Sequence, residues 1–444
     1  MSLQFEMEKT RMLRSLAIIL LTGSLLIVNC FAQGEAALPF LLISPYAEAN
    51  GMGEASVANS TDNPLAMIVN PAHLGMQVGN GRFSFGYNRT DWFPGFGIED
   101  LYYRTFAVTA GMNLNDLFDI TPGLILGAGY SRVFLNLGKQ IIMPPDAPDP
   151  TGTFSAYESS DQFTLSLGFD FFVKASAGIS FKNIYSKLGS GGSEQEDGFG
   201  TASVNSYDYG VLIKIPVIEG VSLFREKPVR LGNSLLPYFD FNFGLALNNR
   251  GDKEVSYGGV FFSDPLPRYA RIGIGIDLGL VYETENVKLR PVSFKWTREA
   301  NDILVHRPGS LSSVAIEPGW KYRGGLGDIN FFDEVILGKT NPETIMKSGW
   351  EFGILGVFYI RGGRFEEDQL RGNRNFSTQG IGIRFAGIIE SFKPNDEAFS
   401  GNPILDFLLH HVDIRYHYSE INTDESNHPL DRTRTHSVSL AIFK

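Results

Sequence analysis

The most constraining feature of this chain is a series of long runs in which apolar and polar residues alternate. In residues 162–170, four apolar side chains are each separated by a polar residue or a glycine, and similar runs cover 172–184, 204–215, 237–248 and 270–282. Successive side chains of a strand point to opposite faces, so each run predicts a strand with one apolar and one polar face. The runs reach the roughly 9–11 residues that a tilted strand needs to cross a bilayer. Strands of globular proteins are shorter, about 5–6 residues.

Membrane-crossing strands have to close into a barrel, because the hydrocarbon core holds no water that could satisfy an open strand edge. Composition agrees with this prediction, since the 444 residues include 35 Phe, 17 Tyr and 49 Gly, which suits a barrel with aromatic girdles. The alternative is a soluble β-sandwich with one wet face, whose strands also alternate. Strand length and aromatic content favour the barrel, and a net charge of −11 argues against nucleic acid as a partner.

The first 32 residues predict a secretory signal peptide. Lys9, Arg11 and Arg14 precede a short apolar run over 16–28, and Ala32 supplies a small residue at the cleavage site. The run is shorter than the roughly 20 residues of a membrane-spanning helix, which argues against an anchor, and Asn29 argues against a lipoprotein site at Cys30. Cleavage would remove Cys30, the only cysteine, so we expect no disulfide or thiol-based site in the mature chain.

The pattern predicts about fourteen strands, an even number as bacterial single-chain barrels have. The two weakest, 287–296 and 314–325, contain Pro291 and Pro318, and proline donates no hydrogen bond to a sheet. The predicted strands cover residues 82–90, 101–112, 122–134, 162–170, 172–184, 204–215, 237–248, 270–282, 287–296, 314–325, 349–361, 377–389, 410–421 and 433–443.

If both ends of the barrel sequence are periplasmic, the connections alternate between the two sides. The tight connections at 170–172 and 283–286 then fall on the periplasmic side, and the long polar segments 141–161 and 187–203 fall outside, as in known barrels. Three connections, near 216–236, 327–348 and 390–409, would be long and periplasmic. Helix-compatible residues at 331–337 and 403–410 predict small periplasmic helices in the last two.

Residues 33–81 differ from the barrel sequence that follows over 82–444. Small residues and turn formers dominate there, with short helix-compatible pieces. We expect this segment to form a hatch that either plugs the barrel or covers its periplasmic mouth.

The hatch also carries a family resemblance. The run over residues 43–55, with Gly51 and Gly53, followed by Asn70, Pro71 and Ala72, resembles the N-terminus of the PorV/PorQ family of FadL-like outer-membrane barrels. Later stretches at 244–251, 265–273, 349–363 and 380–383 are similar to the family in the same order. The resemblance implies a fourteen-stranded barrel with an N-terminal hatch in the outer membrane of a Gram-negative bacterium, in contact with lipid and lipopolysaccharide.

Two functions follow from the resemblance. A PorV-type protein would receive the C-terminal signal domains of type IX secretion cargo and pass the cargo to subunits of the secretion complex. A FadL-like protein would instead transport hydrophobic small molecules across the outer membrane. The first is our leading prediction from the sequence, and the second is the alternative.

Alternation also predicts which polar residues face the lumen. The candidates are Lys174, Asp240, Arg271, Asp277, Asp413, Arg415 and His417. His411 shares a strand face with the last three, which is more typical of a lumen lining than of a metal site, because no further ligand pattern is present. The sequence has no Gly-x-Ser-x-Gly elbow and no phosphate-binding loop, so neither catalysis nor a cofactor is predicted.

Four arginines surround one predicted hairpin, at positions 364, 371, 374 and 384. They would contact anionic lipopolysaccharide or an acidic partner, or else pair with the acidic residues 366–368 beside them. We favour the pairing.

Overall fold

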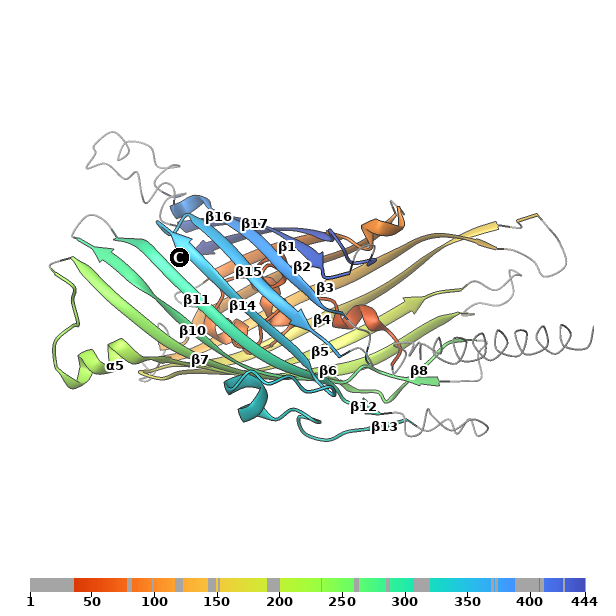
Figure 1. Ribbon diagram of the computed structural model, residues 1–444, viewed down its shortest axis with the longest axis horizontal. Coiled ribbons are helices and arrows are strands. Elements are labelled where there is room, and N and C mark those ends of the chain that lie inside the picture. Colours follow the sequence, from red (N-terminus) through yellow and green to blue (C-terminus); the bar gives the residue numbers. More distant parts are fainter. Residues whose placement is uncertain are drawn as a thin grey trace, which may run out of the picture.

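The computed structural model describes residues 36–443, apart from 78–81, 98–99, 116–122, 143–148, 151, 190–199, 233, 259–262, 285–287, 307–319, 369–370, 372–373, 388–406, 408–410 and 426–427. Fourteen antiparallel strands of this part close into one barrel, so the predicted fold class is confirmed (Figure 1). The barrel strands, in order around the wall, are β1 (Arg82–Asp91), β2 (Leu101–Asn113), β3 (Gly123–Ile142), β4 (Gly152–Asp170), β5 (Lys174–Lys187), β6 (Thr201–Pro216), β7 (Leu235–Gly251), β10 (Tyr269–Glu283), β11 (Lys288–Ile303), β14 (Ile345–Ile354), β15 (Phe358–Glu366), β16 (Phe376–Arg384), β17 (Val412–Thr423) and β18 (Arg434–Phe443).

The barrel closes where the first strand pairs with the last. Arg82 of β1 lies opposite Phe443 of β18, and Asp91 lies opposite Arg434. Each barrel strand therefore has a neighbour on both sides, which leaves no open sheet edge. We call the end of the barrel at Arg82 and Phe443 the terminal end, and the opposite end the loop end.

The outward face of the wall is apolar. In β4, Phe163, Leu165, Leu167 and Phe169 are exposed, whereas the residues between them are buried. Exposed apolar residues recur around the wall, including Phe85 on β1, Ile360 on β15 and Val438 on β18. This is the face that a transmembrane barrel presents to lipid.

One predicted strand is in fact a hairpin. Residues 349–361 belong to β14 and β15, which pair across a turn at 355–357. Leu355 and Gly356 have φ values of 56° and 64° in this turn. Ile354 before the turn and Phe358 after it both point outward and are exposed. The apolar–polar alternation therefore continues across the turn, and the sequence of the hairpin looks like that of one long strand.

The strand predicted at 314–325 is wrong. In the described part of this stretch, β13 (Lys321–Tyr322) pairs with β12 (Val305–His306) in a separate small sheet. The split of 349–361 and the loss of 314–325 compensate, so the strand count stays at fourteen. A second small sheet in another loop-end connection joins β8 (Glu254–Ser256) and β9 (Ser263–Pro265).

The connection predicted at 327–348 on the periplasmic side lies instead at the loop end, because it joins β11 to β14. The predicted helix exists as η4 (Phe331–Ile336), a π-helix, but it packs on the outside of the wall. Val335 belongs to a cluster with Ile272 and Ile274 of β10, whose outward faces alternate with Gly273, which faces the hatch. The helix predicted at 403–410 lies outside the described residues apart from Phe407.

The hatch occupies the inside of the barrel. Its described residues 36–77 form η1 (Pro39–Leu42), α2 (Ala47–Asn50), η2 (Pro64–Ile68) and α3 (His73–Gln77), which lie within the ring of strands (Figure 1). Tyr46, Met52, Leu65 and Leu74 are fully buried there. The hatch thus plugs the barrel and does not merely cover one mouth.

Glycines in the wall allow the hatch backbone to approach closely. A Cβ atom added to Gly363 would overlap the backbone of Gly53, and one added to Gly349 would overlap Met52. Glycines of β4, β7 and other strands meet the hatch backbone in the same way. Close backbone approach is one of the few roles that only glycine fills, and it explains part of the high glycine content.

We therefore expect Gly363→Val to unseat the hatch, because the side chain has no room that a rotamer change would create. The stability should fall by about 3 kcal/mol or more, or the barrel should fail to fold. Gly324→Val is the matched control, since nothing lies within 4 Å of a Cβ at that position. Urea unfolding of both variants in detergent measures the difference, and equal midpoints would show that the hatch is loosely seated.

Candidate functional site

The hatch is fixed to the wall by a buried carboxylate. The Glu299 Oε2 atom accepts hydrogen bonds from the backbone N–H groups of Ser56 (2.7 Å) and Val57 (2.8 Å). The other oxygen, Oε1, lies 3.8 Å from Arg271 Nη1. Hydrogen bonds to an ionised acceptor are stronger than neutral ones, so this residue holds the middle of the hatch against β10 and β11.

The Asn-Pro-Ala motif connects the hatch to β5 and β6. Asn70 Nδ2 donates to the carbonyl oxygens of Val57 (3.0 Å) and Val211 (3.2 Å), and its Oδ1 accepts from the N–H of Ala72 (3.0 Å). The Ser176 hydroxyl donates to the Ala72 carbonyl at 2.7 Å. Pro71 packs on Gly178, where a Cβ would come within 2.5 Å of its carbonyl carbon.

The two motif glycines have different reasons to be glycine. Gly53 has φ +66°, a left-handed conformation that side chains disfavour, and its N–H donates to Thr378 Oγ1 at 2.8 Å. Gly51 instead lies against Gly380 of β16, whose Cα would be 3.2 Å from an added Cβ. Both positions seat the hatch on the wall.

Charged residues cross five neighbouring strands at matched registers. Asp240, Asp277, Lys295, Glu351 and Arg361 are successive cross-strand partners on β7, β10, β11, β14 and β15. Lys214 Nζ lies 2.6 Å from Asp240, Lys295 Nζ lies 3.4 Å from Glu351, and Arg361 Nε donates to Glu351 at 2.6 Å. His417 extends the row, with Nδ1 3.0 Å from Arg361 Nη1. Lys295 Nζ also donates to the Ser60 carbonyl of the hatch at 2.9 Å.

A second group lies on β17. Arg415 Nη2 contacts Asp413 at 2.7 Å and Asp62 of the hatch at 2.8 Å. Lys174 is separate from these residues, because it pairs with Asp170 at 2.9 Å beside the β4–β5 turn and both side chains are well exposed. His411 is also apart, with its Nδ1 3.0 Å from the Phe443 carbonyl.

Two further predictions from the sequence concern metal binding and the four arginines near 364–384. Over the described ranges, no three His, Cys, Asp or Glu side chains are grouped so that they could hold a metal ion. The four arginines each have an acidic partner: Arg364 with Asp424, Arg371 with Glu343, Arg374 with Glu367 and Arg384 with Asp413. Among the acidic residues 366–368, Glu367 forms an ion pair with Arg374 at 2.8 Å, and Glu366 lies 3.7 Å from Arg364.

Sequence reasoning missed three residues that hold the hatch, of which Glu299 and Lys347 are buried and Lys295 is partly buried. Besides Glu299 and Lys295, Lys347 on β14 pairs with Glu54 of the hatch at 3.1 Å. Each alternates with outward residues such as Trp296, Ala300 and Met346, so the signal was present. The predicted strand 287–296 ended too early to include Glu299, and 349–361 began too late to include Lys347.

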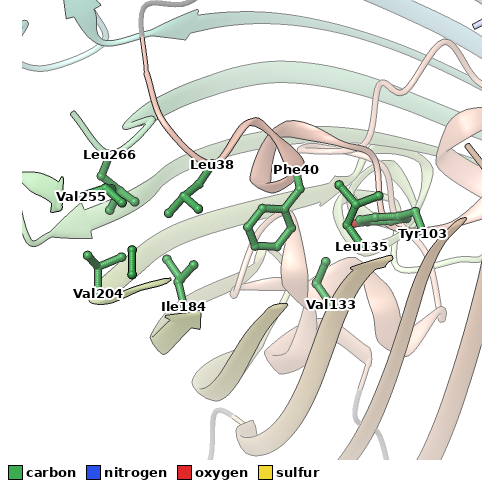
Figure 2. Close-up of a cluster of buried hydrophobic side chains, with 10 residues drawn as sticks. Leu38, Phe40, Tyr103, Val133, Leu135, Ile184, Val204, Val255 and Leu266 are labelled. Carbon is green, nitrogen blue, oxygen red and sulfur yellow. The ribbon is translucent and has the colours of Figure 1, made fainter. Parts of the chain in front are cut away.

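The loop end of the lumen is apolar, in contrast to the charged middle. Figure 2 shows Leu38 and Phe40 of the hatch among inward side chains of the wall and of a loop-end connection. We call this set the mouth cluster; it comprises Leu38, Phe40, Tyr103, Val133, Leu135, Ile184, Ala202, Val204, Val255 and Leu266. The Ala37 N–H donates to the Pro265 carbonyl at 2.9 Å and ties the hatch to the β8–β9 connection.

A cavity of about 20 Å³ lies beneath the mouth cluster. Leu41 and Ile43 of the hatch line it together with Val133, Lys182 and Arg271 of the wall. A space of this size holds about one water molecule.

The geometry defines a class: a closed fourteen-strand barrel of the outer-membrane type, whose lumen is filled by an N-terminal hatch. In the described part of the chain no helix is long and apolar enough to cross a membrane.

Comparison with known proteins gives structural likeness alone. No family model matches the chain, and neither does any curated protein. Among solved structures, the Ralstonia pickettii toluene transporter TbuX is 12% identical, with 89% of this chain and 96% of that chain covered and a TM-score of 0.37. A Pseudomonas aeruginosa FadL homologue is 11% identical over 90% and 97%, with a TM-score of 0.37, and the Pseudomonas putida toluene transporter TodX is 10% identical over 90% and 97%, with a TM-score of 0.34. Identities and scores this low say nothing about the function of this chain.

We expect Glu299→Ala to destabilise the protein by about 3 kcal/mol, because it leaves two hatch N–H groups without their buried acceptor and Arg271 without its ion-pair partner. Asp333→Ala is the control, since its ion pair with Lys339 is exposed and should contribute under about 1 kcal/mol. Chemical denaturation of both variants makes the comparison. Similar losses in the two would contradict the anchoring role of Glu299.

The hatch should also loosen in acid. Burial lowers the pKa of the His73 imidazole to about 4, although its hydrogen bond to the Ser56 carbonyl favours the charged form. A pKa below the ordinary 6.5 means that the stabilisation is complete above that pH and is lost as the pH falls, by about 3 kcal/mol at pH 4. Limited proteolysis of the hatch from pH 7 to pH 4 measures this. In His73→Gln the dependence over this window should be weaker, and an unchanged profile would exclude His73 as its source.

Proposed function

We propose that this protein is an outer-membrane channel for small hydrophobic molecules, which enter the lumen from the loop end at the mouth cluster. The observation that carries the proposal is an apolar patch inside a lumen whose middle is polar and charged. The chain's own Leu38 and Phe40 fill this patch. A hydrophobic solute of similar size would bury the same surface, which is worth about 1.5–3 kcal/mol for each large apolar side chain that it replaces.

The way the hatch is held supports entry at this end. From Glu54 to Gly75, side chains and backbone of the hatch bond to the wall at many points. The first described turn is held less firmly, by the Ala37 N–H and by the Tyr103 hydroxyl, which donates to the Ile43 carbonyl at 3.3 Å. Displacement of residues 37–43 would therefore open the mouth cluster while the rest of the hatch stays in place.

The location in the outer membrane is supported by the apolar outward face and by the even number of strands in a closed barrel. With both chain ends of the barrel on the periplasmic side, the loop end would face the outside of the cell. Lipid would then cover the exposed apolar residues of the wall, and lipopolysaccharide would border the loop end.

The secretion-receptor role stays a prediction of the sequence resemblance. Its proposed partners, cargo C-terminal domains and subunits of the type IX secretion complex, would bind at the loop end. No matched family or relative supports this role, whereas the mouth cluster favours a small apolar ligand.

Probe binding tests the channel proposal. The purified full chain in amphipol is titrated with the apolar fluorophore N-phenyl-1-naphthylamine. Leu38→Ala combined with Phe40→Ala should raise the affinity at least about tenfold, because the competing side chains are removed and tenfold corresponds to 1.4 kcal/mol. Ile184→Asp should abolish this gain, because it places a charge among the apolar walls.

Leu165→Ala is the control for non-specific binding, because it removes an apolar side chain of the outward face. It should leave the affinity unchanged. Equal affinities for the wild type, the double variant and Ile184→Asp, all in folded barrels, would exclude the mouth cluster as a ligand site. Co-purification of exported proteins that share a C-terminal domain, from native membranes, would favour the receptor instead.

A further inference from the structure

The helix α5 (Val217–Phe224) at the terminal end has an apolar face that nothing in the described chain covers. Val217, Val221 and Phe224 recur at the spacing of one helix face, and Leu223 lies on another side of the helix, four residues after Glu219. The side chain of Phe224 is 93% exposed and that of Leu223 is 62% exposed. Exposure of such an apolar face to water is unfavourable. The position of α5 on the barrel indicates what covers this face.

The helix lies against the foot of the wall. It begins where β6 ends, and its buried Gly220 packs on the ring of Phe172, which a Cβ at that position would approach to 2.6 Å. Phe172 belongs to the turn between β4 and β5, where Phe171 and Val173 on either side of it are exposed. Exposed apolar side chains of α5 and of the β4–β5 turn are thus neighbours at the terminal end of the barrel, where Figure 1 places α5.

Positive charge follows the apolar face directly. Arg225, Lys227 and Arg230 lie in the nine residues after Val221, with Glu226 as the acidic residue among them. Arg225 and Lys227 are exposed, and over the described ranges neither forms an ion pair. A helix with an apolar face beside exposed cations is typical of elements that lie in the plane of a membrane interface.

We propose that α5 is an interfacial anchor, which places Val217, Val221 and Phe224 among the acyl chains of the leaflet at the terminal end. Arg225 and Lys227 then contact the phosphates of anionic phospholipids, which attract basic residues next to a membrane. The inference rests on the membrane location that we proposed above. A second copy of the chain would be the competing cover for the same face.

Site-specific labelling tests the anchor. In the full chain with Cys30→Ser, Phe224→Cys is labelled with the environment-sensitive fluorophore NBD and the protein is reconstituted in vesicles of phosphatidylcholine and phosphatidylglycerol. We expect blue-shifted emission and quenching by nitroxide-labelled lipid. Glu219→Cys, an exposed position on another side of the same helix, is the matched control and should give the emission of a label in water.

The role of the cations is tested in the same system. With phosphatidylglycerol omitted, quenching of the label at position 224 should fall at least twofold. Arg225→Gln with Lys227→Gln should remove this difference between the two vesicle compositions. Equal quenching in both compositions for the unsubstituted cations would exclude the headgroup contact.

A label at Leu165→Cys, on the outward face of β4, separates the two levels of the proposal. If this label is not quenched, the membrane location itself is wrong. If it is quenched while the label at 224 reports water, the location stands and the anchor is wrong. A blue-shifted label at 224 that lipid does not quench, in a chain that cross-links as a dimer, would assign the face to a second copy and overturn the anchor.

Discussion

The structure depends on the pairing of β1 with β18, because this pairing removes the last open edge of the sheet. Once the sheet is closed, its two faces meet different surroundings, and the alternation of each strand sorts apolar residues outward and polar residues inward. The inward residues then enclose a space that needs to be filled. The hatch fills it with a largely buried segment and supplies partners for charges such as Glu299, Lys347 and Arg415.

The fold was predictable where alternation is long and uninterrupted. Strands such as β5, β7 and β10 follow directly from their patterns, as does the tight β4–β5 turn. β4 was predicted only in part, because it begins at Gly152, within the segment 141–161 that was predicted as a loop. Alternation does not reveal the turn at 355–357, because Ile354 and Phe358 on either side of it face the same side of the wall. Two strands were therefore predicted as one. Alternation fails again at 314–325, where the described residues Lys321 and Tyr322 pair with β12 in a separate small sheet and not with a barrel strand. Single-sequence alternation reports that a residue is buried or covered, but not by which segment.

The hatch-anchoring residues were predictable only in part. Asp240, Asp277, Asp413 and Arg415 stood out because charges are conspicuous in apolar strands, and each is in contact or in register with another charged group of the wall. Glu299 was missed because its partners are backbone N–H groups of Ser56 and Val57, which have no signature in the sequence. The sequence shows that glycine is abundant, but not that the wall glycines contact the hatch. That role depends on the approach of a backbone segment that is distant in the sequence. The mouth cluster joins strand residues to Leu38 and Phe40, a long-range contact that local patterns do not report.

The close fit of glycine wall and hatch has a consequence for how the molecule is put together. In the closed barrel the wall backbone touches the hatch backbone at Gly349 and Gly363, which leaves little room for residues 36–77 to enter afterwards. We therefore infer that the hatch is in place while the barrel strands pair, and that the pairing of β1 with β18 forms last. The N-terminal position of the hatch suits this order, because the hatch is synthesised before any barrel strand. The strands can then pair around it.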